Sequence, residues 1–201
     1  MKILVFNPLK SLMKRGIPVY TDEYASLLQD MGWEVRTLEM PTWFHGRSKL
    51  SILLGYWIYQ QLALPIFMLK HRITYVFDAY NSYSFLGAMI ARRYLCVVHD
   101  FIPFERKWHL RPASIYMRIL HILAPLVGNT LCIAYIAPKI ARQGARYIRK
   151  PSIILPNIVE PFYYDAKDIL EPDLLAFSNK ASAESRVLLS TISGSGANKD
   201  F

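Results

Sequence analysis

The chain has few of the residues that build disulfide frameworks, metal sites and dinucleotide-binding loops. Its 201 residues include only two cysteines, Cys96 and Cys132, and each lies inside an apolar run. This setting favours buried, reduced thiols over a disulfide or a metal ligand, and it suits the cytoplasm. The histidines show no metal-ligand spacing, so we predict no metal site. The pattern G-x-G-x-x-G is absent, which disfavours a nicotinamide- or flavin-binding Rossmann protein.

A secretory signal is also missing from the sequence. The opening apolar run, residues 3–6, is too short for the apolar core of such a signal, and Lys10, Lys14 and Arg15 follow it closely. We therefore expect the N-terminus to belong to the fold. The protein is expected to be cytoplasmic, with a peripheral position at the inner face of a membrane as an extension of that expectation.

Acidic residues are outnumbered by basic ones. The chain has 24 lysines and arginines against 15 aspartates and glutamates, and its net charge of +9 favours an anionic partner. The helix expected in "PKIARQGARYIRK" is strongly basic, and it fits either a plain solvated face or contact with an anionic membrane surface. Nucleic acid is disfavoured because the aromatic residues lie in apolar segments rather than on a basic strand platform.

One long apolar segment covers residues 50–69, "LSILLGYWIYQQLALPIFML". It is long enough to span a bilayer, but Gln60 and Gln61 lie in its middle and Pro65 interrupts it. We therefore favour a core helix, then an interfacial amphipathic helix, over a membrane span.

The order of the apolar runs predicts an α/β fold. Strands are expected at 2–6, 34–38, 73–77, 95–99, 130–136 and 152–155, and helices alternate with them at 20–31, 82–93, 112–127 and 139–147. This alternation builds parallel sheets, and continuous apolar strands are covered on both faces. We predict a doubly wound, Rossmann-like parallel sheet in residues 1–165, a connector in 166–185, and a further strand with a glycine loop in 186–201.

The end of one strand carries the strongest candidates for catalysis. Ligand sites in doubly wound folds lie beyond the carboxyl ends of the strands, and His99 and Asp100 stand at the end of the strand expected at 95–99. His99 could donate a hydrogen bond or a charge to a developing oxyanion or phosphate, and Asp100 could orient it or take a proton. The alternative is a structural pair at the strand end.

Two strand-to-helix junctions hold further candidates. Gly16, preceded by Arg15, lies between the first strand and the first helix, where a glycine lets the backbone approach a phosphate; an ordinary turn glycine is the alternative. Asp78, Asn81 and Ser82 lie at another junction. We expect Asn81 or Ser82 to cap the following helix, with a ligand contact as the minority interpretation.

The order of these motifs resembles a known family. In sequence, "MKILVFNPL", "GIPVYTDEYASLLQDMGWEVRTL", "YVFDAYNSYSFLGAMIARR", "LCVVHDFIPF" and "CIAYIAPKIARQGARYIRKPSIILPNIVEPFYY" resemble the N-terminal half of the family 4 (group 1) glycosyltransferases. The resemblance implies the GT-B architecture, with two Rossmann-like domains facing a cleft. It implies transfer of a hexose from a nucleoside-diphosphate sugar to a sugar or lipid-linked acceptor in envelope polysaccharide synthesis, with retention and without a further cofactor.

The resemblance also implies roles for individual residues. The family's glycine loop, which approaches the donor phosphates and the acceptor, matches Gly16, with Arg15 in place of the usual paired glycine. The cleft histidine that positions the donor sugar most resembles His99. The family's P-N-G-V-D element appears as "PNIVE", which keeps Asn157. We therefore expect catalysis at His99 and Asp100, and substrate binding at Arg15, Gly16, Asn81 and Asn157.

The donor-binding half of the family is represented only by a short tail. The family's second domain holds the nucleotide sugar with two glutamates eight positions apart, and no such pair occurs near the end of this chain. The tail "LLSTISGSGANKDF" resembles the first strand and glycine loop of that domain, with Gly194, Gly196 and Lys199 at the donor phosphates. We therefore expect a truncated chain that transfers little by itself. The alternative is a non-catalytic, membrane-associated module that binds an acceptor and acts with a separate donor-domain chain.

Overall fold

The computed structural model describes residues 1–12, 16–41, 48–104, 111–148, 150 and 152–156. The chain divides into two compact units, Met1–Ile158 and Val159–Phe201, and all the described residues belong to the first. Several predicted features therefore lie outside the described residues, namely the connector 166–185, the strand and loop of 186–201, and the site candidates Arg15, Asn157, Gly194, Gly196 and Lys199.

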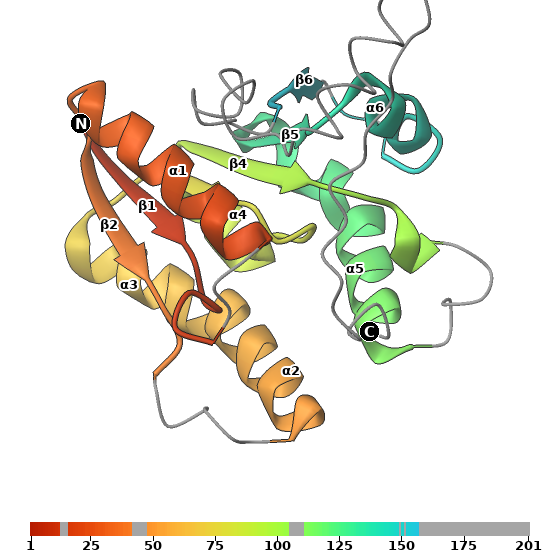
Figure 1. Cartoon of the computed structure of the whole chain (residues 1–201), viewed down its shortest axis with the longest axis horizontal. Coiled ribbons are helices and arrows are strands. Elements are labelled where there is room, and N and C mark those ends of the chain that lie inside the picture. The colour runs from red at the N-terminus through yellow and green to blue at the C-terminus, as the bar shows by residue number, and fades with distance from the viewer. Residues whose placement is uncertain (13–15, 42–47, 105–110, 149, 151, 157–201) are drawn as a thin grey trace, which may run out of the picture. The chain divides into compact units, whose positions relative to one another are not determined.

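Six strands form one sheet in the first unit (Figure 1). Their order is β2-β1-β3-β4-β5-β6, and every neighbouring pair is parallel. The strands are β1 (Lys2–Phe6), β2 (Glu34–Leu38), β3 (Tyr75–Asp78), β4 (Arg93–Val98), β5 (Leu131–Tyr135) and β6 (Ser152–Ile154). The predicted α/β fold with a doubly wound parallel sheet is confirmed, and all six expected strands are present.

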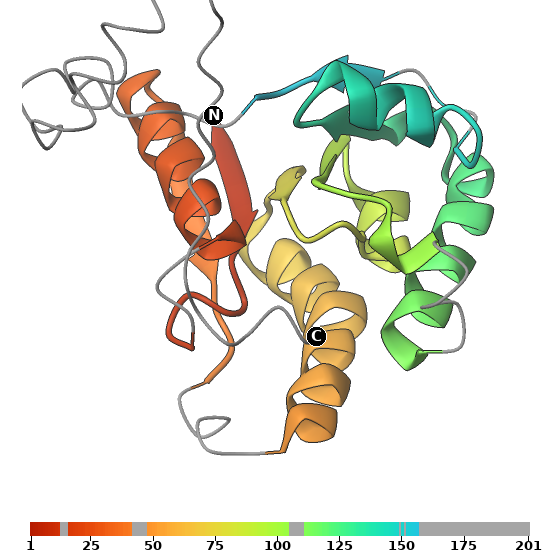
Figure 2. The same cartoon turned by 45° about the vertical axis from the view of Figure 1, so that its right-hand side comes forward.

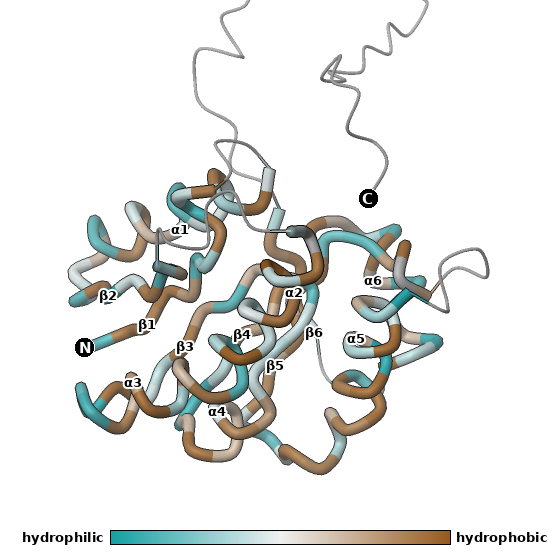
Figure 3. The backbone as a smooth tube through the Cα atoms, turned by 90° about the horizontal axis from the view of Figure 1, so that it is seen from below, coloured by the Kyte–Doolittle hydropathy of each residue, from teal (hydrophilic) through white to brown (hydrophobic). Residues whose placement is uncertain are grey.

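Helices cover both faces of this sheet. One face carries α1 (Ile17–Asp30), whose Tyr20 and Tyr24 belong to the core beneath it. The other face carries α2 (Lys49–Ile58), the π-helical turn η2 (Tyr59–Ala63), α3 (Leu64–His71), α4 (Phe85–Ile90), α5 (Pro112–Leu123) and α6 (Pro138–Gly144), with the short 3-10 segments η3 (Ile102–Phe104) and η5 (Ala124–Thr130). In Figure 3 the strands run between α1 on one side and α3 and α4 on the other.

The interior strand β1 shows why these strands are continuous apolar runs. Successive side chains of a strand point to opposite faces. Ile3 and Val5 join the core under α1, whereas Leu4 and Phe6 join the core on the other face. All four side chains are buried, so no position of this stretch is left for a polar residue.

All four helices of the predicted alternation differ from their predicted bounds: α5 ends at Leu123, α6 covers Pro138–Gly144, and α1 and α4 show the reasons most clearly. α1 begins at Ile17, earlier than expected, because Pro18 is accommodated in the first turn, where the fixed φ of proline suits a helix. The helix expected over 82–93 is only Phe85–Ile90, and Ser84 caps it: the Ser84 hydroxyl accepts the Gly87 N–H at 2.9 Å. The expected cap at Asn81 or Ser82 is therefore wrong.

The two cysteines lie on neighbouring strands as free thiols. Cys96 of β4 is buried as predicted, whereas Cys132 of β5 is only partly buried. Burial raises the pKa of both thiols, so both are protonated at neutral pH.

The apolar segment predicted at 50–69 is confirmed as helical. α2, η2 and α3 form one continuous rod, visible in Figure 1 and Figure 2, because Tyr59 and Leu64 at its junctions keep helical backbone angles. Pro65 lies in the first turn of α3, directly after the π-helical turn. A widened turn of this kind accommodates a proline that would otherwise disrupt the helix. We call this element, Lys49 to His71, the rod.

Candidate functional site

The sheet reverses its direction of growth between β1 and β3. The chain passes from β1 outward to β2, then returns past β1 to add β3 and the remaining strands in order. In open α/β sheets, ligands bind beyond the carboxyl ends of the strands beside such a switch point. Asn7 follows β1 and Asp78 ends β3, so a site is expected along this edge and at the end of β4 next to it.

Gly16 begins α1 with a backbone conformation that favours glycine. Its φ is 70° and its ψ is −134°, and its carbonyl accepts the Tyr20 N–H at 3.1 Å. Among the described residues, a Cβ atom added to Gly16 would meet no heavy atom within 4 Å. The glycine is therefore explained by its backbone angles, and the open space next to it is compatible with the predicted approach of a ligand.

Buried Asn7 holds three segments of this edge together. Its Nδ2 donates to the Pro18 carbonyl and to Asp22 Oδ1, each at 3.0 Å. Its Oδ1 accepts the hydroxyl of Tyr80 at 2.5 Å. The end of β1, the start of α1 and the segment after β3 are thereby fixed to one another.

Asn81 fixes the backbone at the end of β4. It adopts a left-handed φ of 59°, a conformation that asparagine tolerates better than most residues. Its N–H donates to the Val97 carbonyl at 3.1 Å, and its Oδ1 accepts the His99 N–H at 2.5 Å. The structure thus brings two predicted site residues together, but through the His99 backbone rather than through its ring.

The His99 ring is partly buried beside α1. It packs edge-on against Tyr20 with ring centroids 4.7 Å apart, and it is hydrogen-bonded to the Ala79 backbone. Burial lowers the pKa of His99 to about 4, so the ring is neutral at pH 7. Its Nε2 is buried without a hydrogen-bond partner among the described residues. A neutral ring that donates Nδ1–H leaves Nε2 as a hydrogen-bond acceptor, which would suit a ligand hydroxyl better than a phosphate if a ligand displaced the groups that bury it.

Asp100 lines a neighbouring pocket. Its Oδ1 accepts the Ile102 N–H at 3.1 Å, and its side chain lines a pocket of about 260 Å³ beyond the ends of β4 and β5. Lys139 and Arg146 also line this pocket. The two cations suit an anionic ligand group, and the Asp100 carboxylate can accept hydrogen bonds from hydroxyls.

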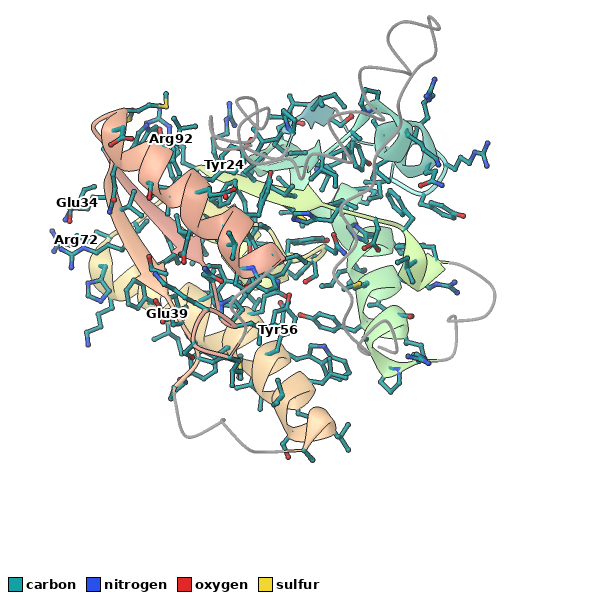
Figure 4. All side chains as sticks on the ribbon, in the orientation of Figure 1. Tyr24, Glu34, Glu39, Tyr56, Arg72 and Arg92 are labelled. Carbon is teal, nitrogen blue, oxygen red and sulfur yellow. The ribbon has the colours of Figure 1, made fainter. Side chains whose placement is uncertain are left out.

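The last described residues of the first unit contact α1. The Tyr20 hydroxyl donates to the Leu155 carbonyl at 3.2 Å, and the hydroxyl of Tyr24, which is labelled in Figure 4, donates to the Pro156 carbonyl at 2.6 Å. Pro156 directly precedes Asn157, so the chain leading to that predicted site residue lies against the helix that also contacts His99. Gly16, the Asn81–His99 pair and the approach to Asn157 are all connected through α1.

A buried carboxyl group ends β3. Oδ2 of Asp78 accepts the Gln60 Nε2–H at 2.8 Å and the Tyr94 hydroxyl at 2.7 Å, and Oδ1 accepts the Tyr80 N–H at 3.2 Å. Burial raises the pKa of Asp78 to about 7, although the bonds from Tyr94 and Gln60 oppose this shift. The carboxyl is thus close to half protonated at neutral pH.

Sequence reasoning missed the network around this carboxyl. Gln60 Nε2 also donates to Ser82 Oγ at 2.9 Å, and Gln60 Oε1 accepts the Tyr116 hydroxyl at 2.7 Å. The rod, the end of β3 and α5 therefore share one polar network. A signal was present, because Asp78 is the only acidic residue in the sequence between Met40 and His99.

A second buried histidine supports Asn81 from α5. His121 Nε2 lies 3.0 Å from the Asn81 carbonyl, and burial lowers the pKa of His121 to about 4. The neutral His121 ring donates to the Asn81 carbonyl. Asn81 is therefore fixed both to the end of β4, through Val97 and His99, and to α5, through His121. Within the described part of the chain, no group of three or more histidine, cysteine, aspartate or glutamate residues is placed to hold a metal ion.

Comparison with known proteins yields no relative on which to rest a function. No family model, no curated protein and no solved structure matches the chain. The fold class rests on the six-stranded parallel sheet itself, and the function has to be argued from the residues at its carboxyl edge.

Proposed function

We propose that this domain is the acceptor-binding part of a glycosyltransferase of the GT-B type. The observation that carries the proposal is His99, a neutral histidine whose buried Nε2 has no partner among the described residues, at the carboxyl end of β4. The order of sequence motifs, which resembles the family 4 glycosyltransferases, supports the same function. In this proposal Nε2 accepts a hydrogen bond from a sugar hydroxyl.

Glycosyl transfer needs the acceptor hydroxyl to be positioned. The hydroxyl oxygen bonds to the anomeric carbon of the donor, the bond from that carbon to the diphosphate oxygen breaks, and the hydroxyl proton passes to a base. Because its pKa is about 4, His99 is a weak base, and its proposed role is to orient a hydroxyl rather than to remove the proton. Asn81 acts on His99 as a positioning residue.

The pocket beside Asp100 fits the remainder of a charged acceptor. Lys139 and Arg146 offer positive charge to a phosphate, as in a lipid-linked sugar, and Asp100 offers an acceptor to hydroxyls. Tight donor binding is not expected of the 201-residue chain, because its sequence has no glutamate pair of the kind that holds the nucleotide sugar in the family it resembles. The lack of this glutamate pair equally favours a non-catalytic acceptor-binding module.

Titration calorimetry and a transfer assay test the proposal together. Octyl glycosides of glucose, galactose, mannose and N-acetylglucosamine, used below their micelle concentrations, serve as acceptor probes, and uridine and guanosine diphosphates serve as donor probes. We expect at least one glycoside to bind the 201-residue chain, the nucleotides to bind weakly, and His99→Phe, which keeps an aromatic ring against Tyr20, to abolish glycoside binding.

Three results would contradict the proposal: no glycoside binding, equal binding by His99→Phe, or tight nucleotide binding. Addition of nucleoside-diphosphate hexoses to the glycoside that binds then separates the two candidates. Slow transfer supports the enzyme, whereas binding without any transfer supports the module.

A further inference from the structure

The rod presents its two glutamine side chains to the domain. Gln60 is fully buried against Asp78, and Gln61 Nε2 donates to the Tyr83 carbonyl at 2.9 Å. Gln61 Oε1 also accepts the Phe85 N–H at 2.9 Å. Both glutamines, which argue against a membrane span in the sequence, therefore find hydrogen-bond partners within the domain. Neither glutamine side chain lies on the outer side of the rod.

The outer side of the rod is apolar instead. Six large apolar residues, each between 45% and 67% exposed, follow one another at intervals of three or four positions: Leu50, Leu54, Ile58, Leu62, Ile66 and Leu69. This spacing aligns them along one side of a helix. A helix that faces water has the opposite arrangement, with apolar residues toward the core and polar residues outward.

The apolar surface continues over the neighbouring helices. α4 packs against α3, and η5 packs against α4. Exposed apolar residues on these elements and on α5 include Met89, Ile119, Ile122 and Leu126. Figure 3 shows the hydrophobic colour on the turns of α3 and α4. We call the stripe of the rod and these four residues the apolar face. Soluble monomers rarely expose contiguous apolar patches above a few hundred Å², so an apolar face of this kind is a candidate docking surface.

The stretch of sequence that includes these helices is strongly basic. The sequence between Met40 and Ile158 has 15 lysines and arginines but only three aspartates and glutamates, and one of those three, Asp78, is buried. Exposed Lys70 and Arg72 lie at the end of the rod, and exposed Arg92 follows α4. Figure 4 shows Arg72 and Arg92 toward the same end of the domain.

We propose that the apolar face docks into the interface of an anionic bilayer, with the rod lying in the membrane plane. The apolar side chains enter the boundary between headgroups and acyl chains, and the basic residues at the edge reach anionic headgroups. A second copy of the chain would cover the apolar residues but bring like charges together, so the charge favours anionic lipid. This inference rests on residues outside the His99 site, and it holds whether or not the domain transfers sugar.

The rod does not cross the bilayer in this arrangement. By length and composition, Leu50–His71 is long and apolar enough to span a membrane, but one side of it is occupied by the domain. Leu64 and Met68 belong to the core over the sheet, and Gln60 belongs to the Asp78 network. A spanning position would break these contacts, whereas an in-plane position keeps them.

Vesicle co-sedimentation of the 201-residue chain tests the proposal. Wild-type protein is mixed with vesicles of phosphatidylcholine alone or of phosphatidylcholine with phosphatidylglycerol, at low and at high salt. We expect sedimentation with the anionic vesicles, weakened by salt, and release by alkaline carbonate. The double variant Leu62→Gln, Ile66→Gln should lose about tenfold or more in affinity, because it removes two apolar side chains from the proposed interface.

Variants away from the apolar face provide the controls, one for the apolar residues and one for the basic residues. Leu27→Gln changes an apolar residue of α1 that is similarly exposed, and it should bind as the wild type does. Lys70→Gln should weaken binding to anionic vesicles, whereas Lys2→Gln, an exposed lysine on β1, should not. Sedimentation velocity without lipid reports self-association of each variant.

Three kinds of result would overturn the proposal. Wild-type protein that stays in the supernatant, or equal losses for Leu27→Gln and the double variant, would exclude docking by the apolar face. A lipid-free dimer that the double variant dissociates, without vesicle binding, would assign the face to a second copy. Retention in the membrane after alkaline carbonate would contradict the in-plane arrangement.

Discussion

Gln60 Nε2 donates to Asp78 Oδ2 across 2.8 Å, and this contact joins the middle of the rod to the carboxyl end of β3. The glutamine is fully buried, and so is the carboxyl group. Through this pair, the helix that carries the outer apolar stripe is fixed to the edge of the sheet that carries the candidate site. A substitution at Gln60 should therefore lower the free energy of unfolding.

Replacement of Gln60 by leucine is expected to lower the free energy of unfolding by about 2–4 kcal/mol. Leucine has a volume similar to that of glutamine, but it makes no hydrogen bonds. Asp78 and the Tyr116 hydroxyl would each lose one buried hydrogen-bond partner. Urea unfolding followed by circular dichroism measures the loss. Leu62→Gln, on the exposed side of the same rod, should change stability by about 0.5 kcal/mol or less, and comparable losses for the two variants would contradict the inward assignment of Gln60.

Asp78→Asn should make stability less sensitive to pH between about 4 and 7. Burial raises the pKa of Asp78 from 3.8 to about 7, so the folded state holds this proton more tightly than the unfolded state does. Its stabilising contribution is present below pH 4 and is lost as the pH rises through 7. The variant keeps a neutral group at every pH, so its stability relative to the wild type should rise across this range, by at most about 1.4 kcal/mol per pH unit.

The measurement is urea unfolding of both proteins at several pH values on either side of this window. Replacing the carboxyl oxygen by an amide adds a constant difference in the free energy of unfolding between the two proteins. The prediction therefore concerns only how this difference changes with pH. A difference that stays flat from pH 4 to 8 would show that Asp78 is ionised in the fold like an exposed carboxyl.

Substitutions at Asn81 separate its backbone role from its side-chain role. Glycine and alanine both remove the hydrogen bond to the His99 N–H, but only glycine accepts a φ of 59° without strain. Asn81→Ala should therefore be less stable than Asn81→Gly by about 1 kcal/mol. Both variants should exchange the His99 amide hydrogen faster than the wild type. Equal stabilities, or unchanged exchange, would remove Asn81 from its proposed role as a positioning residue.

Much of the fold could be predicted from local patterns. β1 was recognisable because it is buried on both faces and therefore has no polar interruption in its apolar run. α4 was overestimated at both ends: it begins at Phe85 and ends at Ile90, and shortly after this end the Arg92 N–H donates to the Thr74 carbonyl at 2.7 Å. That hydrogen bond lies directly before the paired strands β3 and β4, and such a contact between distant segments is not contained in helix periodicity.

The candidate site could be predicted only in part. Gly16, Asn81 and His99 could be named as candidates because each lies at a strand-to-helix junction or a strand end on the edge where such folds bind ligands. Tyr20 was not, since its contacts join residues far apart in sequence: its hydroxyl bonds Leu155, 135 positions away, and its ring packs on His99. The Gln60–Asp78 contact was missed for the same reason, because an apolar helix gives no indication of which side faces the sheet.

The role of His99 is tested most directly by nitrogen-15 NMR of its ring, in the free chain and with the octyl glycoside that binds best. We predict a pKa of about 4, a neutral ring at pH 7 with the proton on Nδ1, and a change at Nε2 when the sugar hydroxyl donates to it. A pKa near 6.5, or an Nε2 resonance that no glycoside moves, would contradict the proposal that His99 binds the acceptor.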